Sequence, residues 1–286
     1  MPKTVFVLLT CAFAMVCAAL HAGDDMLELK ARTRTAGANG EYTVVDKTLH
    51  WDPKKTAVAI CDMWDKHWCE GATRRVGEMA PRMNEVVTEL RKRGALIIHC
   101  PSDTMAYYKD YPQRKLAQDA PKVETQIPLQ RWVHLDEKRE GKLPIDDSDG
   151  GCDCEPQCKN YRAWTHQHDA IKIEANDAIT DSAEAHYLMQ QRGIENLIVM
   201  GVHTNMCVLG RPFSIRQMTM QGKNVVLMRD MTDTMYNPRM APKVDHFSGT
   251  DLVIEHIEKF WCPTTTSVSV IGGTEFHFKE DPRHKN

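Results

Sequence analysis

One short turn of the chain carries residues suited to nucleophilic catalysis. It covers residues 201–208, GVHTNMCV, and runs from an apolar segment into a segment with helical periodicity. A cysteine at a helix N-terminus faces the positive end of the helix dipole and free backbone N–H groups, which favour the thiolate. The same N–H groups can stabilise an oxyanion during acyl transfer. Cys207 is therefore a candidate nucleophile, and the alternative is a buried structural cysteine.

Two other apolar segments end in polar side chains. Asp62 follows the run 56–61, and His99 and Asp103 lie around the end of the run 95–100. Open parallel sheets bind their ligands at the carboxyl ends of the strands. We therefore expect these residues to share one edge of a sheet with Cys207. The alternative role for Asp62 is that of a helix cap or turn residue.

Alternating patterns predict the elements that position these residues. Buried strands are expected at 56–61, 95–100, 196–200 and 224–228. Helices are expected at 76–93, 181–192, 207–221 and 251–260. This order predicts an α/β fold, a doubly wound parallel sheet with helices on both faces, in a single domain at 56–262. An extended arm (23–55) precedes it, and a Pro-, Thr- and Ser-rich tail (263–286) follows.

A long segment without clear periodicity separates the two halves. Residues 110–167 are rich in Pro, Asp, Gly and Cys, and they are too many for a plain connection. The segment follows the second strand, which puts it on the carboxyl side of the sheet. We expect an insertion that acts as a lid over the strand ends and encloses the substrate.

The turn at 201–208, with its strand and helix, resembles the signature of the isochorismatase-like cysteine hydrolases, Gly-(Val/Ile)-x-Thr-(Asp/Asn)-x-Cys-Val. Every fixed position matches. This family includes nicotinamidases, ureidoacrylate and biuret amidohydrolases, and N-carbamoyl amino-acid amidases. Its second landmark is an aspartate after the first strand, which Asp62 supplies. The resemblance covers about residues 56–262, interrupted by the insertion, and implies the isochorismatase-like fold.

The resemblance also implies a role for each matching residue. Cys207 would attack a carbonyl carbon and form a thioester, while Asp62 would accept the thiol proton and return it to the leaving group. The N–H groups of His203 and Cys207 would form the oxyanion hole, with Val202 and Thr204 beside them in the oxyanion and substrate-binding turn. The Val202–His203 bond matches the family's non-proline cis peptide. The His203 side chain is a candidate substrate contact.

The family's third catalytic residue, a lysine, has no matching residue. The usual run Lys-x-x-x-(Ser/Asp)-Ala-Phe aligns its lysine with Ile173. Lys172 is one residue early, and a shift of one residue on a strand turns a side chain to the other face. Three alternatives follow. A bulge in the strand would turn Lys172 back toward the site, Glu174 would face the site in its place, or the lysine role would be vacant. A vacant role predicts a catalytically silent small-molecule-binding protein on the same fold.

Cysteines are the other unusual feature of the chain, with eight of the ten after position 22. The nicotinamidase metal motif Asp-x-His is missing after the second strand, so no metal is expected at the active site. A separate zinc site could use Cys152, Cys154 and Cys158 with His166 or His168. Disulfides are the favoured alternative, joining these three cysteines to each other or to Cys69 or Cys262, with Cys61 and Cys100 as buried thiols.

The first residues indicate export. Residues 1–22 combine one positive charge, an apolar run and small residues, which is the pattern of a secretory signal peptide. The apolar run is shorter than a membrane span requires. We therefore expect a secreted or periplasmic protein without membrane contact after signal removal.

The balance of 36 basic and 39 acidic residues argues against nucleic-acid binding. The expected activity is hydrolysis of a small amide, imide or carbamoyl compound, without a cofactor, by a monomer or a homo-oligomer. The silent binding protein and an isochorismate-type ether hydrolase, which would not need the cysteine, are the alternatives.

Overall fold

The computed structural model describes residues 26–284. The expected signal peptide at 1–22 lies outside the described residues. Within residues 26–284, no helix is both long and apolar enough to cross a lipid bilayer.

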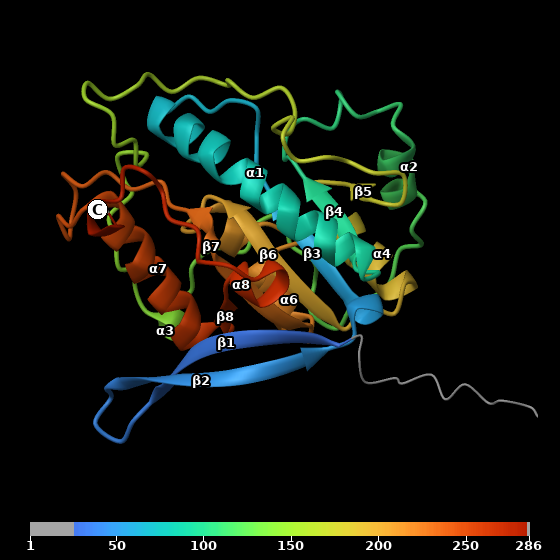
Figure 1. The fold of residues 1–286 in the computed structure, drawn as a ribbon, viewed down its shortest axis with the longest axis horizontal. Coiled ribbons are helices and arrows are strands. Elements are labelled where there is room, and N and C mark those ends of the chain that lie inside the picture. The colour runs from blue at the N-terminus through green and yellow to red at the C-terminus, as the bar shows by residue number, and fades with distance from the viewer. Residues whose placement is uncertain (1–25, 285–286) are drawn as a thin grey trace, which may run out of the picture.

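Eight strands form one sheet in the order β2-β1-β8-β7-β6-β3-β4-β5 (Figure 1). Its six parallel strands are β3 (Thr56–Cys61), β4 (Leu96–Cys100), β5 (Ala178–Ile179), β6 (Asn196–Val202), β7 (Asn224–Asp233) and β8 (Thr264–Thr265). β3 is central and pairs with both β4 and β6. All four strands expected from apolar runs are present, and the mostly parallel α/β fold is confirmed.

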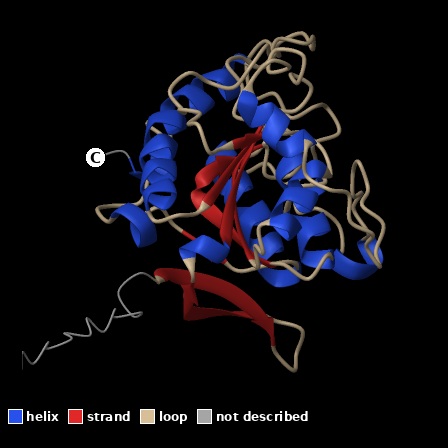
Figure 2. Ribbon diagram, turned by 90° about the vertical axis from the view of Figure 1, so that its right-hand side faces the viewer, coloured by secondary structure: helices blue, strands red, loops and turns tan. Residues whose placement is uncertain are grey.

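Helices cover both faces of this sheet, as Figure 2 shows. α1 (Glu70–Lys92) and α8 (Val268–Ile271) pack on one face, where Val58 and Ile60 point. The opposite face carries α4 (Glu184–Gln191), α5 (Cys207–Gly210), α6 (Ile215–Met220) and α7 (His246–Phe260), and receives Ala57, Ala59 and Cys61. Successive residues of β3 thus enter two different cores, which explains its uninterrupted apolar sequence.

The segment expected as an extended arm forms an antiparallel hairpin. Its strands are β1 (Leu27–Ala36) and β2 (Tyr42–Trp51), and Arg32 of β1 pairs with Thr264 of β8. Figure 2 shows the hairpin projecting from the helix-covered body. The segment after Cys262, expected as a tail, supplies β8, α8 and the 3₁₀ turn Pro282–His284. Another 3₁₀ turn, Pro53–Lys55, leads into β3.

The single helix expected at 207–221 is wrong, because the chain breaks between α5 and α6. Pro212 has no N–H to continue the helix, and it forces the residue before it out of the helical region. Arg211 accordingly has a ψ of 154°, an extended conformation. This break sets the direction of the Arg211 side chain.

The insertion contains two short helices, α2 (Pro112–Gln118) and α3 (Glu137–Glu140). It returns to the strand ends at several points. Val133 N–H donates to Gly210 O at 2.8 Å, and Gln167 forms a β-bridge with Trp64, two residues after Asp62. Part of the insertion therefore lies at the carboxyl edge of the sheet, where the sequence predicts it.

Candidate active site

Asp62 is the first residue after β3, and its backbone holds one carboxylate oxygen in place. Its φ of 49° is a left-handed conformation that Asp adopts more readily than most residues. Its Oδ1 accepts a hydrogen bond from Ser102 N–H at 2.7 Å. The side chain is fully buried, and Oδ2 has no hydrogen-bond partner among the described residues. One oxygen therefore remains available to accept a proton.

The turn after β6 brings Cys207 to the same place. Gly201 has a φ of 110°, and a Cβ there would lie 2.0 Å from Cys61 O, so only glycine lets β6 approach β3 this closely. The Val202–His203 peptide is cis, as the resemblance implies. Cys207 begins α5, and its side chain lies against the carboxylate of Asp62 and the guanidinium of Arg211.

Arg211 is the residue that the sequence analysis missed. It stands four residues after Cys207, and its Nε lies 3.6 Å from Asp62 Oδ2, the oxygen without a hydrogen bond. Its N–H donates to Cys207 O at 3.0 Å, which fixes it to the turn. The sequence pair Arg211-Pro212 could have revealed this residue. A proline predicts that the helix ends at the residue before it, which leaves an arginine outside the helix, close to the nucleophile.

Burial dominates the electrostatics of these three groups. It raises the pKa of the Cys207 thiol well above its usual value; Asp62 raises it further and Arg211 lowers it. The helix N-terminus offers only weak support for a thiolate here, because α5 is one turn long, and burial favours the neutral thiol. Burial also raises the pKa of Asp62, and Arg211 opposes this by stabilising the carboxylate. Burial thus favours the neutral form of both groups, whereas Arg211 favours their ionised forms.

The expected oxyanion hole is geometrically open. Neither the His203 nor the Cys207 backbone N–H forms a hydrogen bond within residues 26–284. Val202 packs in the core beneath α1, so only its peptide bond belongs to the site. Thr204 donates its N–H to Asp233 O at 2.9 Å and shares a hydrogen bond with Thr232, so it holds the turn in place.

Aromatic rings form one wall beside the turn. Trp164 of the insertion stacks on Trp64 at a centroid distance of 4.6 Å, and His67 stacks on Trp164 at 5.7 Å. The His203 ring meets His67 edge-on at 4.9 Å. Burial lowers the pKa of His203 well below its usual value, so this ring is neutral. His203 Nε2 and Trp164 Nε1 are buried without hydrogen-bond partners among the described residues.

These unpartnered atoms mark the site independently of any motif. Buried polar atoms in native proteins are almost always satisfied. Around Cys207, five polar atoms are buried without a hydrogen bond in the described part of the chain: Asp62 Oδ2, Ser102 Oγ, Trp164 Nε1, His203 Nε2 and Arg211 Nε. Such a concentration indicates a place where a polar ligand completes the hydrogen bonding.

None of the residues considered for the lysine role reaches this site. Lys172 is exposed, and its Nζ donates to Asp169 O at 2.8 Å. Glu174 is exposed, and Ile173 is partly buried and carries no charge. The only side-chain cation that contacts both Cys207 and Asp62 within residues 26–284 is that of Arg211.

The residues around the end of β4 do not form a metal site. Both ring nitrogens of His99 are occupied, by Gln167 Oε1 and by Asp177 Oδ2, each at 2.9 Å. Asp103 is exposed and lies 3.4 Å from Arg211. His99 thus ties β4 to the insertion, and the donor atoms present do not fit a metal ion beside Cys207.

A cavity of about 350 Å³ reaches Arg211 from outside. The insertion supplies Leu129, Gln130 and Arg131 to its wall, and Asp103 and Asp181 add carboxylates. The Trp132 ring lies next to this wall, 5.5 Å from the Arg211 guanidinium carbon. The cavity reaches the candidate site at Arg211, and neither Asp62 nor Cys207 is among its lining residues.

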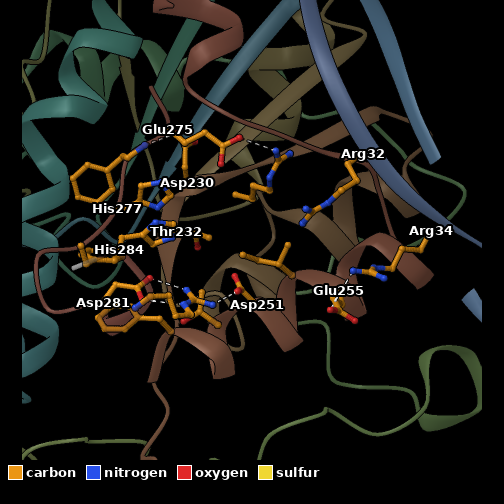
Figure 3. Close-up of a pocket in the computed structure, with 17 residues that line it drawn as sticks. Arg32, Arg34, Asp230, Thr232, Asp251, Glu255, Glu275, His277, Asp281 and His284 are labelled. Carbon is orange, nitrogen blue, oxygen red and sulfur yellow. Dashed lines mark hydrogen bonds and ion pairs between the residues drawn. The ribbon is translucent and has the colours of Figure 1, made fainter. Parts of the chain in front are cut away.

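Another cavity, of about 370 Å³, lies between β1, β7, α7 and the C-terminal segment, and its lining is drawn in Figure 3. Its arginines pair with carboxylates: Arg229 with Glu275, Arg34 with Glu255, and Arg283 with Asp251 and Asp281. Because these charges compensate each other, the cavity lacks the unsatisfied groups found around Cys207.

The cysteines fall into two groups. Cys61 and Cys100 are buried thiols near Asp62, and Cys262 is buried in the core on the α7 side. Cys69, Cys152, Cys154 and Cys158 pack together, although they are far apart in sequence. The eight described cysteines are all unpaired, so the expected disulfides are not formed in this structure.

Three solved structures that resemble this chain share little sequence with it. A cysteine hydrolase from Pseudomonas syringae pv. phaseolicola 1448A is 17% identical, with 77% of this chain and 93% of that chain covered and a TM-score of 0.48. An isochorismatase family protein from Burkholderia thailandensis is 14% identical over 76% and 94% of the two chains (TM-score 0.44). The pyrazinamidase of Pyrococcus horikoshii, solved with zinc, is 13% identical over 74% and 99% (TM-score 0.43).

No curated protein matches the sequence. The family model described as the isochorismatase domain matches residues 56–241, which contain Asp62, the cysteine turn and Arg211. This chain therefore belongs to the isochorismatase family.

Proposed function

We propose that the protein hydrolyses a carbon–nitrogen bond of a small amide, imide or carbamoyl compound, with Cys207 as nucleophile. The observation that carries this proposal is the buried group of Cys207, Asp62 and Arg211, in which Asp62 Oδ2 lacks a hydrogen bond and faces the arginine. A thiol beside a carboxylate held ionised by a cation is the arrangement that nucleophilic catalysis requires.

The proposed reaction begins with proton transfer. Asp62 Oδ2 takes the thiol proton of Cys207 as the sulfur attacks the carbonyl carbon, so no resting thiolate is needed. The His203 and Cys207 N–H groups stabilise the oxyanion. Asp62 then gives the proton to the leaving nitrogen, the C–N bond breaks, and a thioester remains. Water, deprotonated by Asp62, hydrolyses the thioester and regenerates the thiol.

Arg211 takes the electrostatic part of the missing lysine in this proposal. An arginine does not exchange protons near neutral pH, so it stabilises charge and leaves proton transfer to Asp62. The silent-binding alternative rested on a vacant cationic position. A guanidinium 3.6 Å from Asp62 supports the active alternative, because the site keeps a cation.

The N-terminal pattern supports an exported protein, so extracellular or periplasmic amides are the substrates to examine first. The test is ammonia release from a panel of small amides, ureides and cyclic imides by the wild type and by Cys207→Ala. We expect release from at least one compound by the wild type and none above background by the variant. Equal release by both proteins would overturn the assignment of Cys207. No release from any compound while ligands bind would favour the silent protein.

A further inference from the structure

Four cysteines meet at the N-terminus of α1, outside the candidate active site. Cys69 immediately precedes α1, whereas Cys152, Cys154 and Cys158 belong to the insertion. The Cys69 sulfur lies 2.9 Å from that of Cys152 and 3.8 Å from that of Cys154. The Cys158 thiol interacts with those of Cys152 and Cys154. Side chains more than 80 residues apart in sequence therefore converge on one point.

The surrounding hydrogen bonds fit metal-bound thiolates. Gly71 N–H donates to the Cys154 sulfur at 3.2 Å, and Glu70 N–H donates to the Cys158 sulfur. Backbone N–H groups at the start of a long helix stabilise negative charge, such as that of a thiolate. In metal sites, hydrogen bonds from N–H groups to the ligand atoms also hold those ligands in the orientation that binds the metal. Arg239 donates to the carbonyl oxygens of Asp153 and Cys154, which fixes the loop that carries the thiols.

The neighbouring carboxylate is already occupied. Asp153 lies within reach of the sulfurs, 3.5 Å from that of Cys69. Both of its oxygens, however, accept hydrogen bonds from the Arg75 guanidinium, at 2.7 and 3.3 Å. The histidines expected as a fourth ligand are also engaged elsewhere: His166 lies between Asp65 and Asp169, and His168 accepts from Ala170 N–H. Cys158, whose thiol interacts with those of Cys152 and Cys154, is therefore the remaining candidate for the fourth donor. Its sulfur is not among the ligand atoms that lie within 4.8 Å of one another, so metal binding requires it to move closer.

We propose that Cys69, Cys152, Cys154 and Cys158 bind one structural zinc ion that fastens the insertion to the start of α1. Four thiolates without an open position form the closed tetrahedral set typical of structural zinc. In such a site the sulfurs lie roughly 3.8 Å apart, given a Zn–S distance of about 2.3 Å. The Cys69–Cys154 pair already has this spacing, and binding would widen the Cys69–Cys152 pair. Zinc is bound as Zn²⁺ while the thiols release their protons, so no oxidant or reductant is needed.

A pair of disulfides is the competing arrangement for the same four sulfurs. Cys69 lies closer to Cys152 (2.9 Å between the sulfurs) than to Cys154 (3.8 Å), so Cys69–Cys152 is the disulfide that this geometry favours. Met206, one residue before Cys207, packs both against these cysteines and against the core that contains Cys207. The zinc would stabilise the lid without taking part in the chemistry.

The test measures zinc in the full-length mature protein, purified without reductant, chelator or oxygen. We expect about one zinc per chain by elemental analysis and four sulfur neighbours at about 2.3 Å by zinc X-ray absorption. Cys69→Ser and Cys158→Ser should each lose most of the zinc and lower the Tm, whereas the matched control Cys262→Ser should keep it.

Three results would overturn the proposal. They are a chain without zinc whose four cysteines map to disulfides or free thiols, unchanged zinc in Cys69→Ser, and an oxygen in place of the fourth sulfur. None of these readouts depends on amide hydrolysis, so failure of the zinc site and failure of the proposed activity can be distinguished.

Discussion

Substitution of Arg211 tests the electrostatic part of the proposed mechanism. The guanidinium lies 3.6 Å from Asp62 Oδ2, and the two side chains are 13% and 0% exposed. With an effective dielectric constant of about 20, their attraction is about 4–5 kcal/mol. Arg211→Gln removes it while keeping a polar side chain of similar reach. The pKa of Asp62, already raised by burial, then rises further, so less carboxylate is present at neutral pH.

Even a partial loss of this attraction from the transition state would slow the reaction strongly, because about 1.4 kcal/mol of activation free energy corresponds to a tenfold change in rate. We expect Arg211→Gln to lower kcat/KM at least about 100-fold at pH 7. The acid limb of the pH–rate profile should move to higher pH, since the base must be ionised. Arg211→Lys keeps the charge and should retain more activity than Arg211→Gln at every pH.

The assay is ammonia release on the substrate found in the amide panel, from pH 5 to 10, with the Tm of each variant measured to show that it is folded. Lys172→Ala is the matched control, because Lys172 is an exposed cation outside the site, and it should behave like the wild type. The reasoning is refuted if folded Arg211→Gln keeps wild-type kcat/KM and an unmoved acid limb.

Three further predictions concern Asp62, Trp164 and Glu140. Asp62→Asn removes the proton acceptor, so kcat should fall by about 10²- to 10⁴-fold in steady-state ammonia release; a wild-type kcat would contradict this role. Trp164→Ala uncovers Trp64 and should speed iodoacetamide labelling of Cys207, followed by peptide mapping; an unchanged rate would show that this ring does not limit access. Glu140→Gln breaks a buried ion pair with Arg216 and should lower the free energy of unfolding by about 3 kcal/mol in urea titrations. Burial opposes ionisation of Glu140, but hydrogen bonds from His256, Arg216 and Trp261 lower its pKa to about 2. Its stabilising effect is therefore complete above its ordinary pKa and is lost as pH falls toward about 2, so the gap between wild type and variant should narrow there.

The strands that could be predicted from the sequence were those with a continuous apolar run, because such a run indicates a strand that is buried on both faces. β3 is buried at every position because it faces two cores, and the apolar runs 197–200 of β6 and 225–228 of β7 carry the same signal. The β1–β2 hairpin gave no such signal, since β2 is mostly exposed. The pairing of β1 with β8 depends on a contact between residues 32 and 264, which are far apart in the sequence. The two-residue strand β8 is too short to show any period.

The site divides in the same way. The contiguous turn at 201–208 and Asp62 were identifiable, because each lies at the end of a predicted strand. Arg211 was missed since its role depends on the break at Pro212 and on an ion pair across the sheet edge. The sequence named Cys69 and Cys262 as possible disulfide partners of the insertion thiols but could not choose between them, because only the folded chain brings Cys69 to within 2.9 Å of Cys152.

The most direct test of the central claim is to locate the acyl group during turnover. Wild-type protein is mixed with an intact amide that it hydrolyses, and the reaction is quenched in acid during turnover. The protein is then digested, and the peptide that contains Cys207 is analysed by mass spectrometry. The account predicts that this peptide gains the mass of the acyl group, that hydroxylamine removes the gain, and that Cys207→Ala shows neither the adduct nor ammonia release. An acyl group on another residue, or ammonia release by Cys207→Ala at the wild-type rate, would contradict it.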